Sequence, residues 1–261
     1  MTDRILVFIP CYNCAAQIGR VIAQLSKSTA PPFDEVIVVD NGSKDDTRGI
    51  AAAALHASGL PRWKVVQNRA NYNLGGSHKV AFNYAIEHGF THVVVLHGDD
   101  QADIADFAAP IASGLHDQYD SLLGARFMRG SRLHGYSLYR TIGNYGLNII
   151  CGVLLGRSIA DQGSGLNLYS TRYLSSRFYM RFDNTLIFPN LMFIHGVTSK
   201  SKYKFIPISW REEDQRSNAK AVSQALRVIR LTATRRSYQG MTPDPALDYT
   251  FNIVDSKGQT A

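Results

Sequence analysis

The stretch HVVVLHGDDQAD, residues 92–103, joins a short apolar run directly to a histidine, two carboxylates and an amide. Four consecutive apolar residues, 93–96, predict a strand that is covered on both faces, as in a parallel sheet. A strand that ends in Asp99 and Asp100 brings charge to its carboxyl end, which is where ligands bind in open α/β sheets. For an isolated pair of aspartates, a solvated acidic turn would be the simpler interpretation.

Strand and helix patterns alternate along the first half of the chain. Apolar runs typical of strands occur at 4–10, 35–40, 63–68, 93–96 and 120–126. Segments with helical periodicity lie between them, at 14–28, 43–58, 76–89 and from residue 104 onward. Strands that alternate with helices predict right-handed crossovers and an α/β fold with a doubly wound, mostly parallel sheet.

Two common functions of such a sheet are disfavoured by the residues after the first strand. A dinucleotide-binding fingerprint would read GxGxxG, but the chain reads PCYNCA there, and it has no P-loop. Cys11 and Cys14 form a CxxC, yet no second ligand pair lies at zinc spacing and no thioredoxin-like pattern surrounds them. We therefore expect ordinary loop cysteines, and a nucleotide, if bound, that is not cradled by glycines.

Charge is distributed unevenly over the 261 residues, whose net charge is +7. Residues 1–125 carry 9 Lys and Arg against 13 Asp and Glu, whereas residues 126–236 carry 18 against 5. This asymmetry predicts a phosphate-bearing partner or an anionic membrane surface for the second half. No nucleic-acid-binding signature accompanies the basic stretch, so nucleic acid is not an expected partner.

Four motifs at the predicted carboxyl ends resemble those of the family-2 glycosyltransferases, which use nucleotide-diphosphate sugars. The matching residues are Pro10, Tyr12 and Asn13, then Asp40, Gly42 and Ser43, then Asn73 and Gly75, and finally His97, Asp99 and Gln101. The resemblance implies a nucleotide-diphospho-sugar transferase fold of the GT-A type. It also implies that Asp99, Lys79 and the residues of the first three motifs bind the nucleotide sugar.

A divalent cation is implied by the same resemblance, because a departing sugar diphosphate carries negative charge that a hard cation can offset. We expect Mn²⁺ or Mg²⁺ to be bound mainly by Asp99, with Gln101 and His97 in support. His97 stands where the family usually has an acidic residue, and imidazole suits Mn²⁺ better than Mg²⁺. Alternatively, His97 is a neutral histidine beside the site. Asp100 is expected to point to solvent or to orient a neighbour.

The second half is most similar to the dolichyl- or polyprenyl-phosphate mannose synthase branch of that family. The similarity rests on GARFMRGSR (124–132), on the apolar segment 138–155 and on the block around Asp161. It implies that an acceptor phosphate is contacted by Arg126, Arg129, Arg132, Arg140 and Asn148. The chain departs from the branch on this acceptor side, at Tyr145, Asn167, Leu191 and Glu213.

Transfer with inversion at the anomeric carbon is the activity that the resemblance implies, with Asp99 and Asp161 as catalytic residues. A polyprenyl phosphate is already ionised near neutral pH and requires no general base. A saccharide hydroxyl, the alternative acceptor, would require one, either Asp161 or Glu213 with Asp214. A catalytically silent homologue that binds nucleotide sugars is a further alternative. The sequence predicts no oligomeric state.

Two segments of the second half are expected to be helices at a membrane surface. Residues 138–155 are strongly apolar, and residues 219–236 combine apolar positions at helical spacing with several arginines. Both are too short to span a bilayer and fit interfacial helices, although ordinary core-facing helices are the alternative. With no apparent signal peptide, we expect a cytoplasmic protein that can bind peripherally to the inner face of the membrane.

The domain organisation follows from these segments. We expect one catalytic α/β domain over residues 1–215, consisting of a nucleotide-sugar half (1–125) and an acceptor half (126–215). Residues 216–261 are expected to form a basic helix and a polar tail. Within that region, residues 237–261 contain two prolines and two glycines and are predicted to be a loosely ordered extension.

Overall fold

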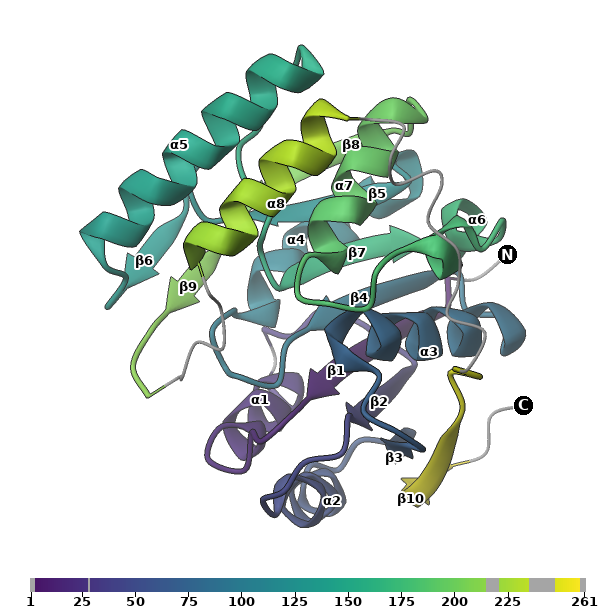
Figure 1. Ribbon diagram of the computed structural model, residues 1–261. Helices are drawn as coiled ribbons and strands as arrows, with labels where there is room; N and C mark the ends of the chain where they lie inside the picture. The colour runs from purple at the N-terminus through teal and green to yellow at the C-terminus, as the bar shows by residue number, and fades with distance from the viewer. Residues whose placement is uncertain (1–2, 28, 215–220, 235–246, 259–261) are drawn as a thin grey trace.

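The computed structural model describes residues 3–27, 29–214, 221–234 and 247–258, which are built around an eight-stranded sheet (Figure 1). The strand order is β10-β3-β2-β1-β4-β7-β5-β8. In chain order these strands are β1 (Ile5–Cys11), β2 (Glu35–Asp40), β3 (Trp63–Asn68), β4 (His92–Leu96), β5 (Ser121–Ala125), β7 (Leu166–Ser170), β8 (Tyr203–Pro207) and β10 (Phe251–Lys257). A separate pair is formed by β6 (Arg132–His134) and β9 (Ser209–Arg211).

Strand directions confirm the predicted α/β fold with a mostly parallel sheet. Strands β3, β2, β1 and β4 are mutually parallel, and so are β5 and β8. Strand β7 lies antiparallel between β4 and β5, and β10 lies antiparallel along β3. The second half of the chain is thus attached to the first through a strand of opposite direction.

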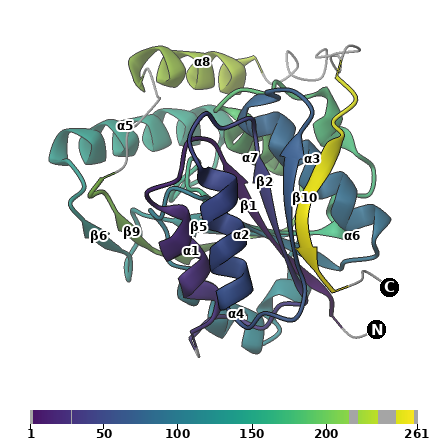
Figure 2. The same cartoon turned by 90° about the horizontal axis from the view of Figure 1, so that it is seen from below.

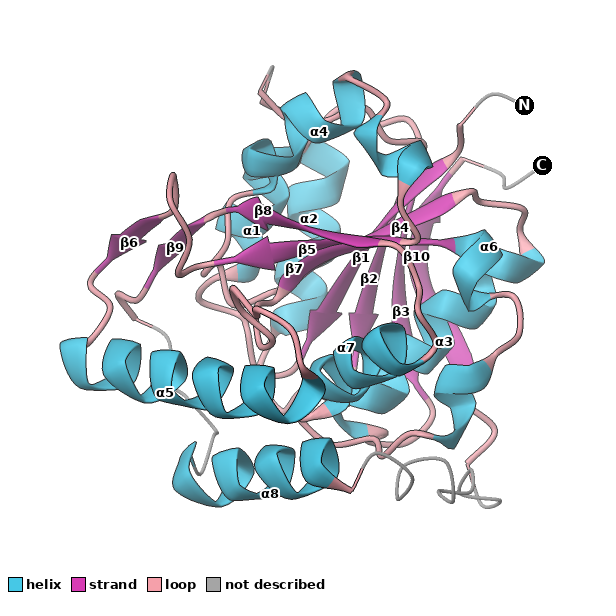
Figure 3. Ribbon diagram, turned by 90° about the horizontal axis from the view of Figure 1, so that it is seen from above, coloured by secondary structure: helices cyan, strands magenta, loops and turns pink. Residues whose placement is uncertain are grey.

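Helices cover both faces of the sheet, as Figures 2 and 3 show from opposite sides. One face carries α1 (Ile18–Leu25), α2 (Thr47–Ala57) and α4 (Ala108–Ala112). The other face carries α3 (Asn73–Glu87), α6 (Thr171–Leu174) and α7 (Phe188–Thr198), and beyond them lie α5 (Leu138–Leu155) and α8 (Ala221–Ala233) side by side. Three short 3₁₀ helices complete the described elements, namely η1 (Ile104–Phe107), η2 (Leu115–Gln118) and η3 (Phe178–Arg181).

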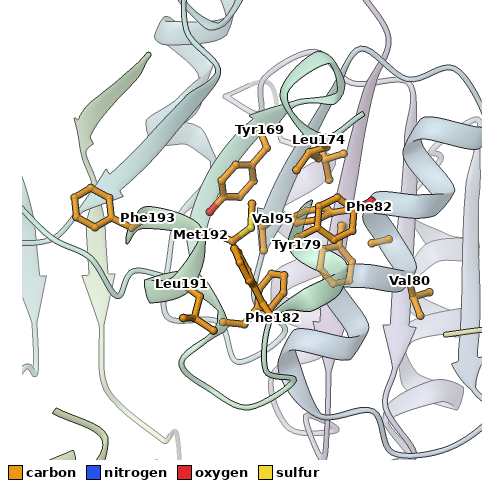
Figure 4. Packing of buried hydrophobic residues seen from close by; sticks show 14 of the residues in the cluster. Val80, Phe82, Val95, Tyr169, Leu174, Tyr179, Phe182, Leu191, Met192 and Phe193 are labelled. Atoms are coloured by element: carbon orange, nitrogen blue, oxygen red, sulfur yellow. The ribbon is translucent and has the colours of Figure 1, made fainter. Parts of the chain in front are cut away.

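Burial on both faces explains why β4 is apolar at successive positions. Val93 and Val95 pack into the core beneath α3 and α7, whereas Val94 and Leu96 pack into the core beneath α1. Successive side chains of a strand point to opposite faces, so a doubly covered strand needs no polar positions. Figure 4 shows the α3 and α7 side, where Val95 lies among aromatic rings that include Phe82 and Tyr169.

The C-terminal tail differs in part from its prediction. Residues 251–257 form the edge strand β10, so the prediction of a loosely ordered extension is wrong for this segment. Its sequence FNIVDSK lacks an alternating apolar pattern, and its pairing with β3 depends on backbone hydrogen bonds that composition does not reveal. Residues 237–246 and 259–261 of the tail lie outside the described residues, as do residues 219–220 and 235–236 of the predicted helix 219–236.

Candidate active site

The carboxyl ends of three parallel strands bring the predicted loops together. In the register of the sheet, Cys11 at the end of β1 lies opposite Asp40 at the end of β2. The backbone N–H of Gly98, just after β4, donates to the carbonyl of Pro10 at 3.1 Å. The loops after β1, β2 and β4 therefore form one continuous edge, as the strand pattern predicts.

The loop after β1 is fastened to the loop after β2 through Asn13. Its backbone N–H donates to Ser43 Oγ at 2.9 Å, and its side-chain oxygen accepts from the Lys44 N–H at 2.8 Å. Asn13 has a left-handed backbone with a φ of 55°, which asparagine tolerates better than most residues. Tyr12 beside it is 38% exposed, so its ring is accessible to a ligand at this edge.

Asp40 organises the second loop from a fully buried position. Its carboxylate accepts from the backbone N–H of Ser43 at 3.2 Å and lies 3.3 Å from Arg48 Nη1. Gly42 between them has a φ of 81°, a conformation that favours glycine. Asp40 thus shapes the loop, and its contact with the nucleotide sugar stays a prediction.

Asparagines connect this loop to the start of α3, a feature that the sequence analysis did not single out. The side-chain oxygen of Asn41 accepts from Asn68 Nδ2 at 3.0 Å and from the Tyr72 N–H at 2.8 Å. Its amide nitrogen donates to Asn71 Oδ1 at 2.8 Å. Asn73, which has an exposed side chain and a φ of 57°, then begins α3 at the same edge. The density of asparagines at 68, 71 and 73 was the available signal.

Gly75 and Lys79 have structural roles that differ from the predicted contacts with a nucleotide sugar. A side chain at Gly75 would lie 2.8 Å from the backbone of Asp183 and Asn184, so the glycine allows close packing. Lys79 is buried, and its ammonium donates to the Phe182 carbonyl at 2.6 Å and to Tyr249 Oη at 3.2 Å. In the described structure both residues hold the loop before α7 rather than face the edge.

His97 directly follows β4 and lies beneath the chain at Gly165. A side chain at Gly165 would come within 2.8 Å of His97 Nδ1, so the glycine makes room for the ring. His97 Nε2 is buried and has no hydrogen-bond partner among the described residues. Burial lowers the pKa of His97 although the neighbouring Asp99 acts in the opposite direction. The imidazole is therefore neutral at neutral pH and can offer a lone pair.

Asp99 is a second potential metal ligand beside His97. Burial raises the pKa of its carboxyl group, and His97 offsets the rise only in part. A cation beside the two groups would relieve the cost of burying the carboxylate and would use the lone pair of the imidazole. Gln101 lies next to them: its N–H donates to Asp99 Oδ1 at 3.3 Å and its amide nitrogen donates to Glu212 at 3.4 Å. The amide oxygen of Gln101 is the atom left for a metal, so the three residues fit a divalent cation.

Asp100 turns away from this site, and the expectation that it points to solvent is wrong. With a φ of 59° its buried carboxylate accepts from Arg20 Nε at 2.8 Å, from Gln24 Nε2 at 2.8 Å and from Arg211 Nη2 at 3.0 Å. It orients its neighbours, which was the other expectation. The two adjacent aspartates thus have different roles. Asp100 anchors α1 and β9, whereas Asp99 lies beside His97 and Gln101.

The acceptor-side residues are largely paired with one another. Asp161 accepts from Arg126 Nε at 2.7 Å and Nη2 at 3.0 Å, and also from the backbone N–H groups of Arg126 and Gly163. Although burial lowers the pKa of Arg126, the charge of Asp161 outweighs it and raises that pKa. Arg126 is therefore a buried partner of Asp161 rather than a free contact for a phosphate.

The other predicted acceptor contacts divide into two groups. Arg140 is ion-paired with Glu212, and the buried Asn148 donates to the Ala160 carbonyl at 3.1 Å. Arg129 and Arg132 are exposed in the segment between β5 and α5, so they are the arginines whose side chains face solvent there. Glu212, which contacts both Gln101 and Arg140, links the two sides of the site and was missed in the sequence.

Comparison with known proteins identifies the family. Residues 6–189 match the family model described as glycosyl transferase family 2, and the chain belongs to this family. The uncharacterized protein MJ1222 of Methanocaldococcus jannaschii is 29% identical over 168 residues, which are 64% of this chain and 65% of that protein. A UDP-N-acetylglucosamine–dolichyl-phosphate N-acetylglucosaminyltransferase of Methanococcus voltae is 27% identical over 181 residues, 65% of this chain and 71% of the enzyme.

Solved structures show that the fold is of the GT-A type. Glucosyl-3-phosphoglycerate synthase from Mycobacterium tuberculosis, in complex with Mn²⁺, UDP and glucosyl-3-phosphoglycerate, superposes with a TM-score of 0.59 and 18% identity. That match covers 98% of this chain and 90% of the synthase. TarS from S. aureus in complex with UDP-GlcNAc has a TM-score of 0.56 and 18% identity, covering 88% of this chain and 66% of TarS.

Proposed function

We propose that this glycosyltransferase moves a sugar from a nucleotide-diphosphate sugar to a polyprenyl phosphate at an anionic membrane surface, with inversion at the anomeric carbon. The observation that carries this proposal is the outer face of α5, whose solvent-exposed side chains are apolar. The related enzyme from Methanococcus voltae, which by its name acts on dolichyl phosphate, supports the same class of acceptor.

The outer face of α5 has the composition of a buried surface although it faces solvent. Its exposed large side chains are Leu138, Tyr139, Ile142, Tyr145, Ile149, Ile150 and Val153. Ile142 is 63%, Ile149 65% and Val153 78% exposed, and the single charged residue of the helix, Arg140, lies on the inner side against Glu212. Contiguous exposed apolar patches of this kind mark interaction surfaces, and a helix of this type can lie in a membrane interface.

Basic residues border this face. Helix α8 lies beside α5 (Figure 3). It exposes Val222, Leu226 and Arg230, together with Arg227, which is ion-paired with Asp183. Exposed arginines also precede and follow α5, at positions 129, 132 and 157. Each basic side chain near an anionic leaflet adds about 1 kcal/mol of attraction, which favours lipid over a neutral partner. Among the described residues, no helix combines the length and the hydrophobicity needed to cross a bilayer.

The donor would lie at the edge formed by the loops after β1, β2 and β4. Tyr12 offers an accessible ring for a base, and the loop held by Asp40 brings backbone close to the nucleotide. Asp99, with the lone pair of His97 and the amide oxygen of Gln101, would hold a divalent cation. Such a cation offsets the negative charge that develops on the leaving diphosphate.

An ionised phosphate acceptor is also favoured by what the carboxylates of the acceptor side do. A sugar hydroxyl would need a base within reach, but both oxygens of Asp161 accept hydrogen bonds from Arg126 and Gly163. Asp214 is paired with Arg20 at 2.9 Å. A phosphate monoester attacks without losing a proton, so it places no such demand on these residues.

The test is transfer from radiolabelled UDP-, GDP- and dTDP-sugars to a membrane lipid extract, with Mn²⁺ and with a chelator. Organic-soluble, mild-acid-labile product that requires the metal is the expected result. Donor hydrolysis without a lipid product would shift the acceptor to a saccharide. If no donor reacts while calorimetry detects nucleotide diphosphate binding with Mn²⁺, the protein would be a silent binding homologue and the proposal would be wrong.

A further inference from the structure

Four potential metal ligands gather at the opposite end of β4 from the active site. They are Asp3 before β1, His92 at the start of β4, and His116 and Asp117 in η2. One ligand atom from each lies within 4.8 Å of the others. His116 Nε2 is 3.1 Å from Asp3 Oδ2 and 3.9 Å from Asp117 Oδ2, and His92 Nε2 is 4.0 Å from Asp117 Oδ1.

The four side chains are layered from the interior to the surface. The imidazoles of His92 and His116 are 6% and 3% exposed, whereas the carboxylates of Asp3 and Asp117 are 40% and 53% exposed. A cation could therefore reach the carboxylates from solvent and contact the buried imidazoles beneath them. His116 Nδ1 is in addition buried without a hydrogen-bond partner among the described residues.

The ring of His92 has a hydrogen-bond partner on the side away from the cluster. His92 Nδ1 lies 3.0 Å from the hydroxyl of Thr91, which in turn lies 3.0 Å from both the carbonyl and the N–H of Arg4. In the tautomer that donates from Nδ1 to this hydroxyl, the lone pair of Nε2 is available to a metal beside the carboxylates. Metal-ligating histidines are held in this way by a second hydrogen bond.

Charge and chemistry indicate which ion would fit. Two imidazoles with two carboxylates match the nitrogen and oxygen ligands of Zn²⁺ and other borderline first-row cations. In a tetrahedral site with metal–ligand bonds of about 2.0–2.2 Å, neighbouring ligand atoms lie roughly 3.3–3.6 Å apart. The four ligand atoms, now within 4.8 Å of one another, would therefore have to move closer together to bind such an ion.

We propose that Asp3, His92, His116 and Asp117 form a second cation site, selective for Zn²⁺-type ions, that fastens the segment before β1 to η2. The site is separate from the active site, because His92 begins β4 and His97 follows its end, about 16 Å away at the rise of a strand. The two sites also differ in ligands, since the active site offers Asp99, one imidazole and an amide. The second site therefore prefers Zn²⁺ and the first prefers harder cations.

The test is titration of chelator-treated, desalted full-length protein with Co²⁺, followed by displacement with Zn²⁺, in the presence of excess Mg²⁺. We expect one tightly bound ion, visible d–d absorption for Co²⁺, and a rise in melting temperature with Zn²⁺. Asp117→Asn, at an exposed position that leaves the core unchanged, should weaken Zn²⁺ binding at least tenfold, and so should Asp3→Asn. Asp99→Asn should leave this ion in place.

The matched control is Asp255→Asn, because Asp255 is a surface carboxylate 2.9 Å from His56 and belongs to no cluster of three or more potential ligands among the residues that the structure describes. It should not change Zn²⁺ affinity. The proposal is wrong if Asp117→Asn and Asp3→Asn bind Zn²⁺ as the wild type does, or if the ion is lost with Asp99→Asn instead. It is equally wrong if the wild-type protein binds no Zn²⁺ below about 100 μM, which corresponds to a binding free energy of only about 5.5 kcal/mol.

Discussion

The donor side and the acceptor side of the molecule use their polar residues differently. On the predicted donor side, Asn13, Asp40 and Asn41 each accept from a backbone N–H of a neighbouring loop, so they shape the edge of the sheet. On the acceptor side, Arg126 pairs with Asp161, and the exposed surface beyond them is apolar. In the proposed function, the first side would hold a polar nucleotide sugar and the second would contact lipid.

The largest effect is expected from Asp161→Asn, which removes the charged partner of the buried Arg126. Breaking one side of a buried ion pair costs about 3–5 kcal/mol in the free energy of unfolding, because it leaves a charge without compensation. Urea denaturation measures this loss. In the protein that remains folded, transfer to a phosphate acceptor should change little, because Asp161 takes no proton.

The double variant Asp161→Asn, Arg126→Met is the control for this interpretation. Replacing both charges by uncharged groups should recover part of the lost stability. A fall in turnover of more than a hundredfold in fully folded Asp161→Asn would contradict the phosphate acceptor and make Asp161 a general base.

Asp99→Asn should have the next largest effect, this time on activity. Loss of one group that stabilises developing charge typically lowers turnover by about a hundredfold to a thousandfold. Stability at pH 7 should not fall. Burial raises the pKa of Asp99, so the folded state resists ionisation, and the resulting penalty is present at pH values above that pKa and disappears below it. Steady-state kinetics and urea denaturation of the same samples measure both quantities.

Asp100→Asn is the matched control for Asp99→Asn, because the adjacent carboxylate anchors Arg20 and Arg211 instead of facing the site. It should lower stability more than Asp99→Asn does. Mn²⁺ affinity of the wild type should also weaken as the pH falls through the raised pKa of Asp99, since a protonated carboxyl is a poor ligand. Equal Mn²⁺ affinity in wild type and Asp99→Asn would exclude Asp99 as a metal ligand.

A smaller effect is expected on the acceptor side from Ile149→Glu on the outer face of α5. Burying an isoleucine side chain contributes about 1.5–3 kcal/mol, so its replacement should weaken partition to anionic vesicles by roughly tenfold to a hundredfold. Flotation with vesicles measures the partition. Ile253→Glu is the control. Ile253 is 57% exposed, close to the 65% of Ile149, but it lies on the edge strand β10 and not on α5. Equal losses in both variants would argue against a specific membrane face.

Sequence patterns predict those features of the molecule that depend on residues close together in the chain. The edge formed by the loops after β1, β2 and β4 follows from local patterns, because each strand is a continuous apolar run that stops at a polar motif. Helix α5 was predicted with its observed bounds for the same reason. These features depend on neighbours in the chain, so a single sequence is sufficient.

Features that depend on distant partners were not predictable in this way. Gly75 accommodates Asn184, and Arg126 is neutralised by Asp161, but neither partner is signalled near the residue in sequence. Strand β10 pairs with β3 through its backbone and carries no periodic apolar pattern. The matched motifs lie together at one edge of the sheet, yet motif resemblance did not indicate that Gly75 and Lys79 hold a loop there.

The smallest effect is expected from Tyr249→Phe, which tests whether Lys79 holds a loop or binds the nucleotide. The variant keeps the ring, 4.8 Å from the ammonium, and the bond from Lys79 to the Phe182 carbonyl, but it removes the hydroxyl that accepts from Lys79 at 3.2 Å. The same hydroxyl is also hydrogen-bonded to the side chain of Asn184 at 3.2 Å, so its removal should lower the free energy of unfolding by about 1–3 kcal/mol. The KM for the donor should not change, because Lys79 holds the loop before α7 and not the nucleotide. If KM rose while stability stayed constant, Lys79 would be assigned to the donor site, and the C-terminal segment would have a role in substrate binding.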